Sequence, residues 1–157
     1  MGIHVVQFQP EIPQNTGNIA RTCAATNTTL HLIRPLGFST DDKHLKRAGL
    51  DYWEHVDVRY YDSLEIFFNQ NADGEFFFLT KYGTNTYSDF DMSQLDKDYF
   101  FIFGRETSGL PDEVIASNKD RCLRVPMTDK VRSLNLSNTA AILVYEALRQ
   151  QGFPQLS

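Results

Sequence analysis

The sequence predicts an α/β protein with a mainly parallel sheet flanked by helices. Strand-like segments, rich in β-branched and aromatic residues, alternate with segments of helical character. Residues 75–80 and 99–103 are continuous apolar runs, which are typical of strands buried on both faces of a parallel sheet. No repeat, low-complexity tract or linker interrupts this order. The 157 residues suffice for one sizeable core, and we expect a single domain over residues 1–157.

The first half of the chain is expected to form a strand, a helix, a strand and a short charged helix, at residues 3–8, 15–26, 30–33 and 41–48. Asn15 or Thr16 is the expected N-cap of the first helix, because each side chain can accept a hydrogen bond from a free backbone N–H. The core stripe of that helix is expected to comprise Ile19, Ala20, Cys23 and Ala24. Arg21 lies beside this stripe and can point outward. Pro35 closes the second strand.

The second half is expected to form a strand, a helix, two strands, a helix, a strand and a helix, at residues 56–60, 63–69, 75–80, 99–103, 111–117, 122–125 and 138–151. Ser63 is the expected cap of the helix that it begins. Pro111 suits a first helical turn, where its missing N–H is not needed. The last helix is expected to end at Gly152 and Pro154.

The last helix is apolar around much of its circumference. Its expected buried stripe, at helical spacing, comprises Ala141, Val144, Tyr145 and Leu148. Ile142 and Leu143 lie off that stripe and are also apolar. Such a helix is either deeply buried within one chain or covered by a second subunit, and the sequence leaves both alternatives open.

The formal net charge of −5 argues against a general nucleic-acid binder, whose domain is usually basic. Any role with RNA must therefore depend on a local cluster of positive charge. Cys23 and Cys122 lie far apart, which predicts neither a disulfide framework nor a zinc site and fits a reducing cytosol. We see no signal peptide and no membrane-spanning run, so a cytoplasmic protein without a membrane partner is expected. P-loop, Rossmann and serine-hydrolase motifs are absent.

Three loops of unusual content follow predicted strands, at residues 79–83, 104–111 and 125–127. In a parallel sheet they open on the same edge, where ligands of such sheets bind. Their backbone groups, with an apolar wall from Leu79, Met127 and Leu134, suit an adenine base. Tight turns after buried strands explain the glycines of these loops equally well.

Polar side chains are concentrated at the start of the last helix. Asn135, Ser137, Asn138 and Thr139 exceed what capping alone requires, which suggests a loop shaped to hold a polar small molecule. Glu106, in the 104–111 loop, is either a solvated acid or a group that accepts a proton or a substrate hydrogen bond. The four histidines have no metal-ligand spacing, so no metal is expected.

Basic residues are unevenly placed. One cluster, in the charged segment 41–48, contains Lys43, Lys46 and Arg47. Other basic residues occupy or flank the proposed pocket loops, at Lys81, Arg105, Lys130 and Arg132. Arg21 lies one turn into the first helix, where it can add to an anion site or simply pair with a surface acid. These groups can form a positive rim for a phosphate backbone.

Three sequence blocks together resemble the SPOUT methyltransferases. They are PEIPQNTGNIAR at residues 10–21, FIFGRETSGLP at 101–111, and RVPM at 124–127 leading to RSLNLSN at 132–138. The resemblance covers nearly the whole chain. The short length and the segment 37–52 are similar to the branch that methylates the ribose of the tRNA wobble nucleotide.

The resemblance implies properties that the residues alone do not show. It implies a deep trefoil knot in the C-terminal part, a homodimer, and S-adenosylmethionine as cofactor, with S-adenosylhomocysteine as product and no metal. The residues linked to catalysis are Asn15, Arg21, Glu106 and Asn135. The expected cofactor contacts are Leu79, Thr80, Gly104, Glu106, Val125, Met127, Ser133, Leu134 and Asn138. The expected RNA contacts are Arg21, Lys43, Lys46, Arg47, Arg105 and Arg132.

The implied reaction is methyl transfer to a ribose 2′-hydroxyl of the wobble nucleotide, a cytidine or a modified uridine. Because a guanidinium is a poor base, we expect Arg21 to clamp the adjacent phosphate and stabilise the developing oxyanion. The proton acceptor is left open between Glu106 and a phosphate-bound water. Two other functions remain: ribose methylation of ribosomal RNA, and an inactive RNA-binding or assembly module on the same fold.

Overall fold

The structure, a computed structural model, describes residues 2–39 and 52–157. The described chain contains one seven-stranded sheet in the order β3-β2-β1-β6-β4-β7-β5, and every paired strand is parallel. The strands are β1 Gly2–Phe8, β2 Thr29–Ile33, β3 Val58–Tyr61, β4 Glu75–Leu79, β5 Asn85–Thr86, β6 Asp98–Phe103 and β7 Cys122–Arg124. The helices are α1 Pro13–Thr26, α3 Leu64–Gln70, α4 Asp112–Ala116 and α5 Leu136–Gln150, with a 3₁₀ turn at Lys119–Arg121. The predicted α/β class with a parallel sheet is confirmed.

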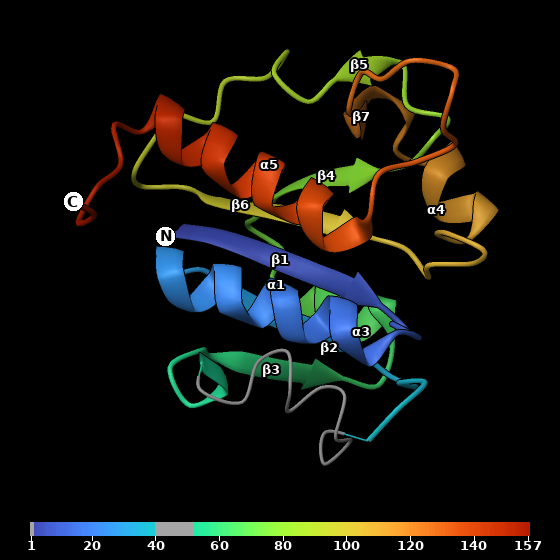
Figure 1. Cartoon of the computed structure of the whole chain (residues 1–157), viewed down its shortest axis with the longest axis horizontal. Coiled ribbons are helices and arrows are strands. Elements are labelled where there is room, and N and C mark those ends of the chain that lie inside the picture. The colour runs from blue at the N-terminus through green and yellow to red at the C-terminus, as the bar shows by residue number, and fades with distance from the viewer. Residues whose placement is uncertain (1, 40–51) are drawn as a thin grey trace.

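Helices cover both faces of the sheet. In Figure 1, α1 and α5 lie side by side in front of the strands, and α3 lies behind them. Alternate residues of the central strand explain the two layers, since Val5 joins the core beneath α1 and α5, whereas Val6 joins the core beneath α3 and α4. The charged helix expected at residues 41–48 lies outside the described residues.

The carboxyl ends of the strands share one edge of the sheet. The arrowheads of β1, β3, β4 and β6 point the same way in Figure 1, as the parallel registers require. The chain leaves β1 for β2 and β3 on one side, then returns to build β4, β6 and β7 on the other. Helices α1 and α5 both begin at this edge. The loops that were expected to form a pocket therefore do open together.

The predicted N-cap of the first helix and the predicted start of the last helix both need correction. Helix α1 begins at Pro13 with Ile12 in the cap position, and no side chain caps it. Asn15 is buried inside the first turn, because Pro13 supplies the helix start and other groups bind the free backbone N–H groups. Helix α5 begins at Leu136, two residues earlier than expected, with Asn135 as its cap. The expected Ser63 cap of α3 is confirmed, since its hydroxyl accepts from Ile66 N.

The buried stripe of α5 differs from the expected one. Its core residues are Ala140, Leu143, Val144, Ala147 and Leu148. Tyr145, expected in the core, is 45% exposed, and Ala141 is only half-buried. On a helix that is apolar on most sides, several sets of residues share the same helical spacing, and the packing of the helix on the sheet decides which set is buried. The stripe therefore packs within the chain, and the homodimer stays a prediction.

Strand β5 and its connection were not expected. Only two residues long, β5 pairs with β7 through Asn85 and Leu123. The segment before β5 can approach β7 closely because residue 83 is a glycine, where an added Cβ would lie 2.7 Å from the carbonyl carbon of Leu123. Such a short strand carries no periodic signal, so propensity could not reveal it.

A chain of hydrogen-bonded polar groups, buried except at the half-buried Asp98, crosses four strands beneath α3. His4 Nε2 lies 2.9 Å from Asp98 Oδ1, His4 Nδ1 lies 2.9 Å from His31 Nε2, and His31 Nδ1 lies 2.9 Å from Tyr61 Oη. His4 and His31 are therefore buried parts of the fold. Burial lowers the pKa of His4 despite the opposing effect of Asp98, and lowers the pKa of His31 to about 3.

The two histidines make stability depend on pH. The unfolded chain binds more protons than the folded chain once the pH falls below the ordinary histidine pKa of 6.5. The contribution that the neutral, buried histidines make to the free energy of unfolding is thus fully present above that pH and is lost as the pH falls toward their folded pKa values. His31 alone should lower the free energy of unfolding by about 2 kcal/mol between about pH 7.5 and about pH 5.

Urea unfolding at several pH values checks this expectation. The variant His31→Gln removes one titrating group while the carboxylates, which titrate at lower pH, remain. Its stability should decline less steeply with falling pH than that of the wild type. Equal slopes for the two proteins would contradict a neutral, buried His31.

Candidate active site

Glu106 links two strand-end loops. It lies in the loop after β6, and its carboxylate reaches the loop between β1 and α1. Oε1 accepts from Glu11 N at 2.9 Å, and Oε2 accepts from Ile12 N at 2.8 Å. The side-chain amide of Asn15 donates to the same Oε2 at 3.4 Å. Glu106 thus binds the backbone N–H groups of the two residues that precede α1 and the side chain of Asn15 in its first turn.

Asn15 connects Glu106 to the start of α5. The Oδ1 of Asn15 accepts from Asn135 Nδ2 at 3.2 Å. The Oδ1 of Asn135 in turn accepts from Ser137 N at 2.9 Å and from the Ser137 hydroxyl. Each residue of this series therefore donates a hydrogen bond to the next: Ser137 to Asn135, Asn135 to Asn15, and Asn15 to Glu106. We call this the amide chain.

The amide chain joins three of the four residues predicted to act in catalysis, and the fourth, Arg21, lies apart. Asn15 is buried, while Asn135 is exposed at the sheet edge. Arg21 is exposed on α1, with its guanidinium carbon 4.9 Å from the centre of the Tyr52 ring. Six residues separate Arg21 from Asn15, or about 9 Å along a helix axis. Within one chain, the structure therefore does not bring Arg21 to the amide chain.

A second set of contacts joins the same two loops, and sequence reasoning missed it. Thr107 donates to Glu11 Oε1 from its backbone N at 3.1 Å and from its hydroxyl at 2.8 Å. Arg105 Nε donates to Gln9 Oε1 at 2.8 Å, and its guanidinium lies 4.7 Å from the Phe8 ring. The position of Glu11, an acid just before a helix without a capping side chain, was the signal in the sequence that could have drawn attention to it.

The residues predicted to hold a cofactor lie around the carboxyl ends of β4, β6 and β7. Met127 and Leu134 are 44% and 37% exposed, and Leu79 is half-buried. Residues 125–134 form neither helix nor strand; Asp129 and Lys130 lie in a turn, where Lys130 N donates to the Thr128 hydroxyl at 3.4 Å. Exposed apolar side chains beside backbone that belongs to no helix or strand suit a ligand with an aromatic base and polar edges.

The other residues predicted to contact the cofactor differ in their exposure and in the hydrogen bonds that they already make. The backbone N of Thr80 donates to Leu123 O at 3.1 Å, and its carbonyl accepts from Gly83 N at 3.1 Å. Ser133 is exposed in the same loop as Leu134, and Val125 directly follows β7. Asn138, the expected first residue of the last helix, lies exposed in the first turn of α5.

Of the basic residues predicted to contact RNA, the structure describes Arg21, Arg105 and Arg132, which lie on separate parts of the chain, in α1, in the loop after β6 and in the loop before α5. Lys43, Lys46 and Arg47 lie outside the described residues. Arg132 is exposed in the loop before α5. The guanidinium of Arg105 already binds Gln9 and, at 3.4 Å, the Ser108 hydroxyl, so this side chain is held within the loop.

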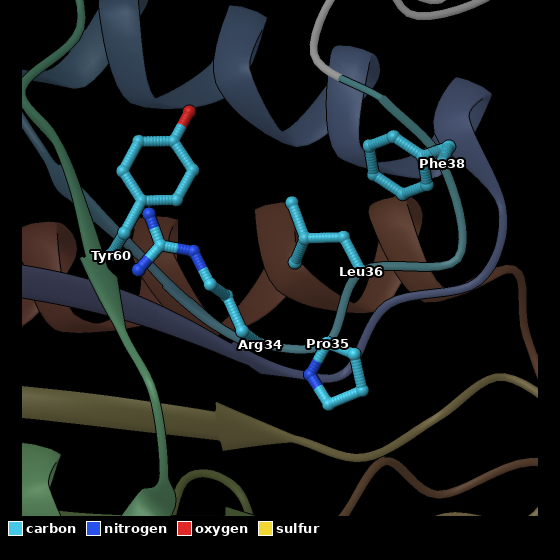
Figure 2. A pocket seen from close by; sticks show the side chains of 5 residues that line it. All are labelled: Arg34, Pro35, Leu36, Phe38 and Tyr60. Atoms are coloured by element: carbon cyan, nitrogen blue, oxygen red, sulfur yellow. The ribbon is translucent and has the colours of Figure 1, made fainter.

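A hollow lies at the same sheet edge, on the side of β2 and β3. Figure 2 shows the Arg34 guanidinium beside the Tyr60 ring, with Leu36 and Phe38 across the opening and Pro35 below. The guanidinium carbon lies 5.0 Å from the ring centre, and Arg34 also pairs with the exposed Asp62. Sequence reasoning did not single out this hollow.

Two kinds of feature are absent from the described residues. No cluster of three or more metal-ligating side chains is found in that part of the chain. Neither does any helix there have the length and apolarity needed to cross a membrane.

The close packing at Gly104 gives a stability prediction. A Cβ added at this position would lie 2.2 Å from the backbone carbon of Gly109, so the loop that carries Glu106 would have to shift. Gly104→Ala should lower the free energy of unfolding by about 3 kcal/mol. Gly2→Ala is the matched control, because a Cβ there meets nothing within 4 Å. Thermal unfolding of both variants checks the difference, and similar melting temperatures would contradict it.

Comparisons with known proteins agree with this geometry. A Geobacillus stearothermophilus protein provisionally named as a tRNA (cytidine(34)-2′-O)-methyltransferase is 71% identical over 157 residues, covering 100% of both chains. A Methylovorus glucosotrophus tRNA (cytidine(34)-2′-O)-methyltransferase is 47% identical, covering 95% of this chain and 96% of its own. A solved structure described in connection with 2-OH methylation of C/U34 on tRNA superposes with a TM-score of 0.88 at 44% identity, covering 96% of both chains.

More distant structures support the fold alone. The AviRb methyltransferase of Streptomyces viridochromogenes, solved in complex with the cofactor AdoMet, superposes with a TM-score of 0.79 at 22% identity, covering 96% of this chain and 58% of its own. The resemblance drawn from the three sequence blocks is thereby confirmed at the level of fold and family. The profile of the SpoU rRNA Methylase family matches residues 2–145, and the chain belongs to that family.

Proposed function

We propose that this protein transfers a methyl group from S-adenosylmethionine to the ribose 2′-hydroxyl of the wobble nucleotide, position 34, of tRNA. The observation that carries the proposal is the amide chain at the carboxyl edge of the sheet, where ligands of parallel sheets bind. Its members come from the three blocks that resemble SPOUT methyltransferases. Relatives with 71% and 47% identity are named for this activity, which supports the same substrate here.

The residues around β4, β6 and β7 fit S-adenosylmethionine. The exposed Met127 and Leu134 can cover the faces of an adenine, and backbone groups of residues 125–134, which lie outside helix and strand, can bind its edges. Gly104 lets the two ends of the loop after β6 pack on each other, which shapes the loop that carries Glu106. The cofactor would supply an electrophilic methyl group, so the chemistry needs no metal. The distant AdoMet-bound structure is consistent with this cofactor.

Arg21 is proposed to act on the RNA rather than on the cofactor. Its exposed, permanently charged guanidinium can bind a phosphate and stabilise the oxyanion that develops on the ribose. Arg21 lies apart from the amide chain within the same subunit. We therefore propose that the protein forms a homodimer, in which Arg21 of one subunit completes the site of the other. The exposed Tyr145 on α5 is consistent with such an interface. The trefoil knot, the single domain and the cytoplasmic location stay predictions.

Glu106 is proposed to position groups rather than to accept the proton. Each of its oxygens already accepts a backbone N–H, and Oε2 also receives the Asn15 amide. These three bonds use three of the about four lone-pair positions of the carboxylate, which leaves little room to accept a proton from a substrate. The phosphate-bound water is then the remaining candidate for proton acceptor.

Ribosomal RNA is a second candidate substrate, because the matching family profile is described as an rRNA methylase. Incubation of the purified protein with tritiated S-adenosylmethionine and either bulk tRNA or ribosomal RNA separates the alternatives. We expect label in tRNA, and mass spectrometry should place it on the ribose of nucleotide 34. Label only in ribosomal RNA would favour the second candidate, and tight RNA binding without label would favour an inactive module.

Arg21→Ala tests the proposed role of the guanidinium. Loss of the phosphate clamp should lower the rate of methyl transfer by a factor of about 100 or more. Calorimetry should still show wild-type binding of S-adenosylmethionine. Arg59→Ala is the control, since Arg59 is an exposed arginine on β3 that pairs with Asp57. Loss of cofactor binding in Arg21→Ala, or an unchanged rate, would refute the role.

A further inference from the structure

Two carboxylates cross between the same two loops in opposite directions. Glu106, after β6, binds the backbone N–H groups of Glu11 and Ile12, after β1. Glu11 reaches back and accepts from the backbone and hydroxyl of Thr107. The loops are therefore joined by a reciprocal pair of contacts, which we call the carboxylate clasp.

The backbone that carries Glu11 is fixed from a third direction. Gly37 N donates to Pro10 O at 2.9 Å, and a Cβ on Gly37 would lie 3.0 Å from Glu11 Cα. The chain after β2 thus packs directly against the base of the Glu11 side chain. Glu11 consequently extends from a well-defined point, and its bonds to Thr107 set where the β6 loop lies.

The Glu11 contacts contribute little to global stability. Thr107 is exposed and Glu11 is half-buried, so water competes for both groups. The hydrogen bonds from Thr107 hold the pKa of Glu11 below its ordinary value, which keeps the carboxylate ionised and able to accept both bonds. A contact of this kind affects geometry more than it affects the folding equilibrium.

We propose that Glu11 is a positioning residue, which holds Thr107 so that the neighbouring Glu106 keeps the Asn15 amide aligned toward Asn135. Thr107 directly follows Glu106, so movement of one displaces the other. Without the Glu11 bond, the β6 loop can shift relative to α1, and the amide chain loosens although all of its members remain. The kinetic part of this inference rests on the proposed methyl transfer.

Kinetics of matched variants test the clasp. Glu11→Ala should lower kcat about tenfold while leaving the KM for S-adenosylmethionine within about twofold, because small displacements of reacting groups are costly in rate. Thr107→Val should lower kcat in the same way, whereas Thr107→Ser, which keeps the hydroxyl, should restore it. Glu113→Gln, an exposed acid on α4, is the control for charge loss. An unchanged kcat in Glu11→Ala, or no restoration by serine, would overturn the proposal.

A second readout does not depend on activity. In ¹⁵N NMR spectra of the full chain, Thr107→Val and Glu11→Ala should shift the side-chain amide resonances of Asn15, although that amide is hydrogen-bonded to Glu106 and to neither substituted residue. Glu113→Gln should leave them in place. Unshifted Asn15 resonances would overturn the positioning role. If the wild type methylates no RNA, the proposed function fails, and these resonances alone then decide whether the clasp acts on Asn15.

Discussion

The carboxylate of Glu106 is the contact on which the arrangement of the site depends. Helix α1 starts at a proline and has no side-chain cap. Glu106 accepts from the backbone N–H groups of Glu11 and Ile12, just before this helix, and also from the side-chain amide of Asn15 in its first turn. Through Asn15 the constraint extends to Asn135, which caps α5. One side chain thus relates the starts of both helices that cover the front of the sheet.

Local rules predicted most of the elements and the Ser63 cap of α3, but not the starts of the two long helices. The parallel sheet follows from alternating segments and from apolar runs such as β6. Asn15 or Thr16 was predicted to cap α1, but Asn15 instead donates to Glu106, 91 positions away, and no local rule contains a contact over that separation. The buried stripe of α5 was misplaced for a similar reason, since its rotation depends on the sheet beneath it and not on its own periodicity.

The candidate site, too, could be predicted from the sequence only in part. That loops after parallel strands meet at one edge could be predicted from the fold class alone. That Asn15, Glu106 and Asn135 share a site came from the resemblance, and the structure supplies the contacts that join them. The bonds of Glu11 with Thr107 were missed, because no local pattern pairs residues 96 positions apart. The structure also separates Arg21 from the amide chain, which the sequence could not show.

The central claim is that Glu106, Asn15 and Asn135 act as one connected unit, and a double-mutant cycle on unfolding free energy tests it most directly. Glu106→Gln and Asn135→Ala alter residues that are joined only through Asn15. If the chain is connected, the double variant should differ from the sum of the single variants by about 1 kcal/mol or more. Additivity within about 0.3 kcal/mol, as found for independent sites, would contradict the account.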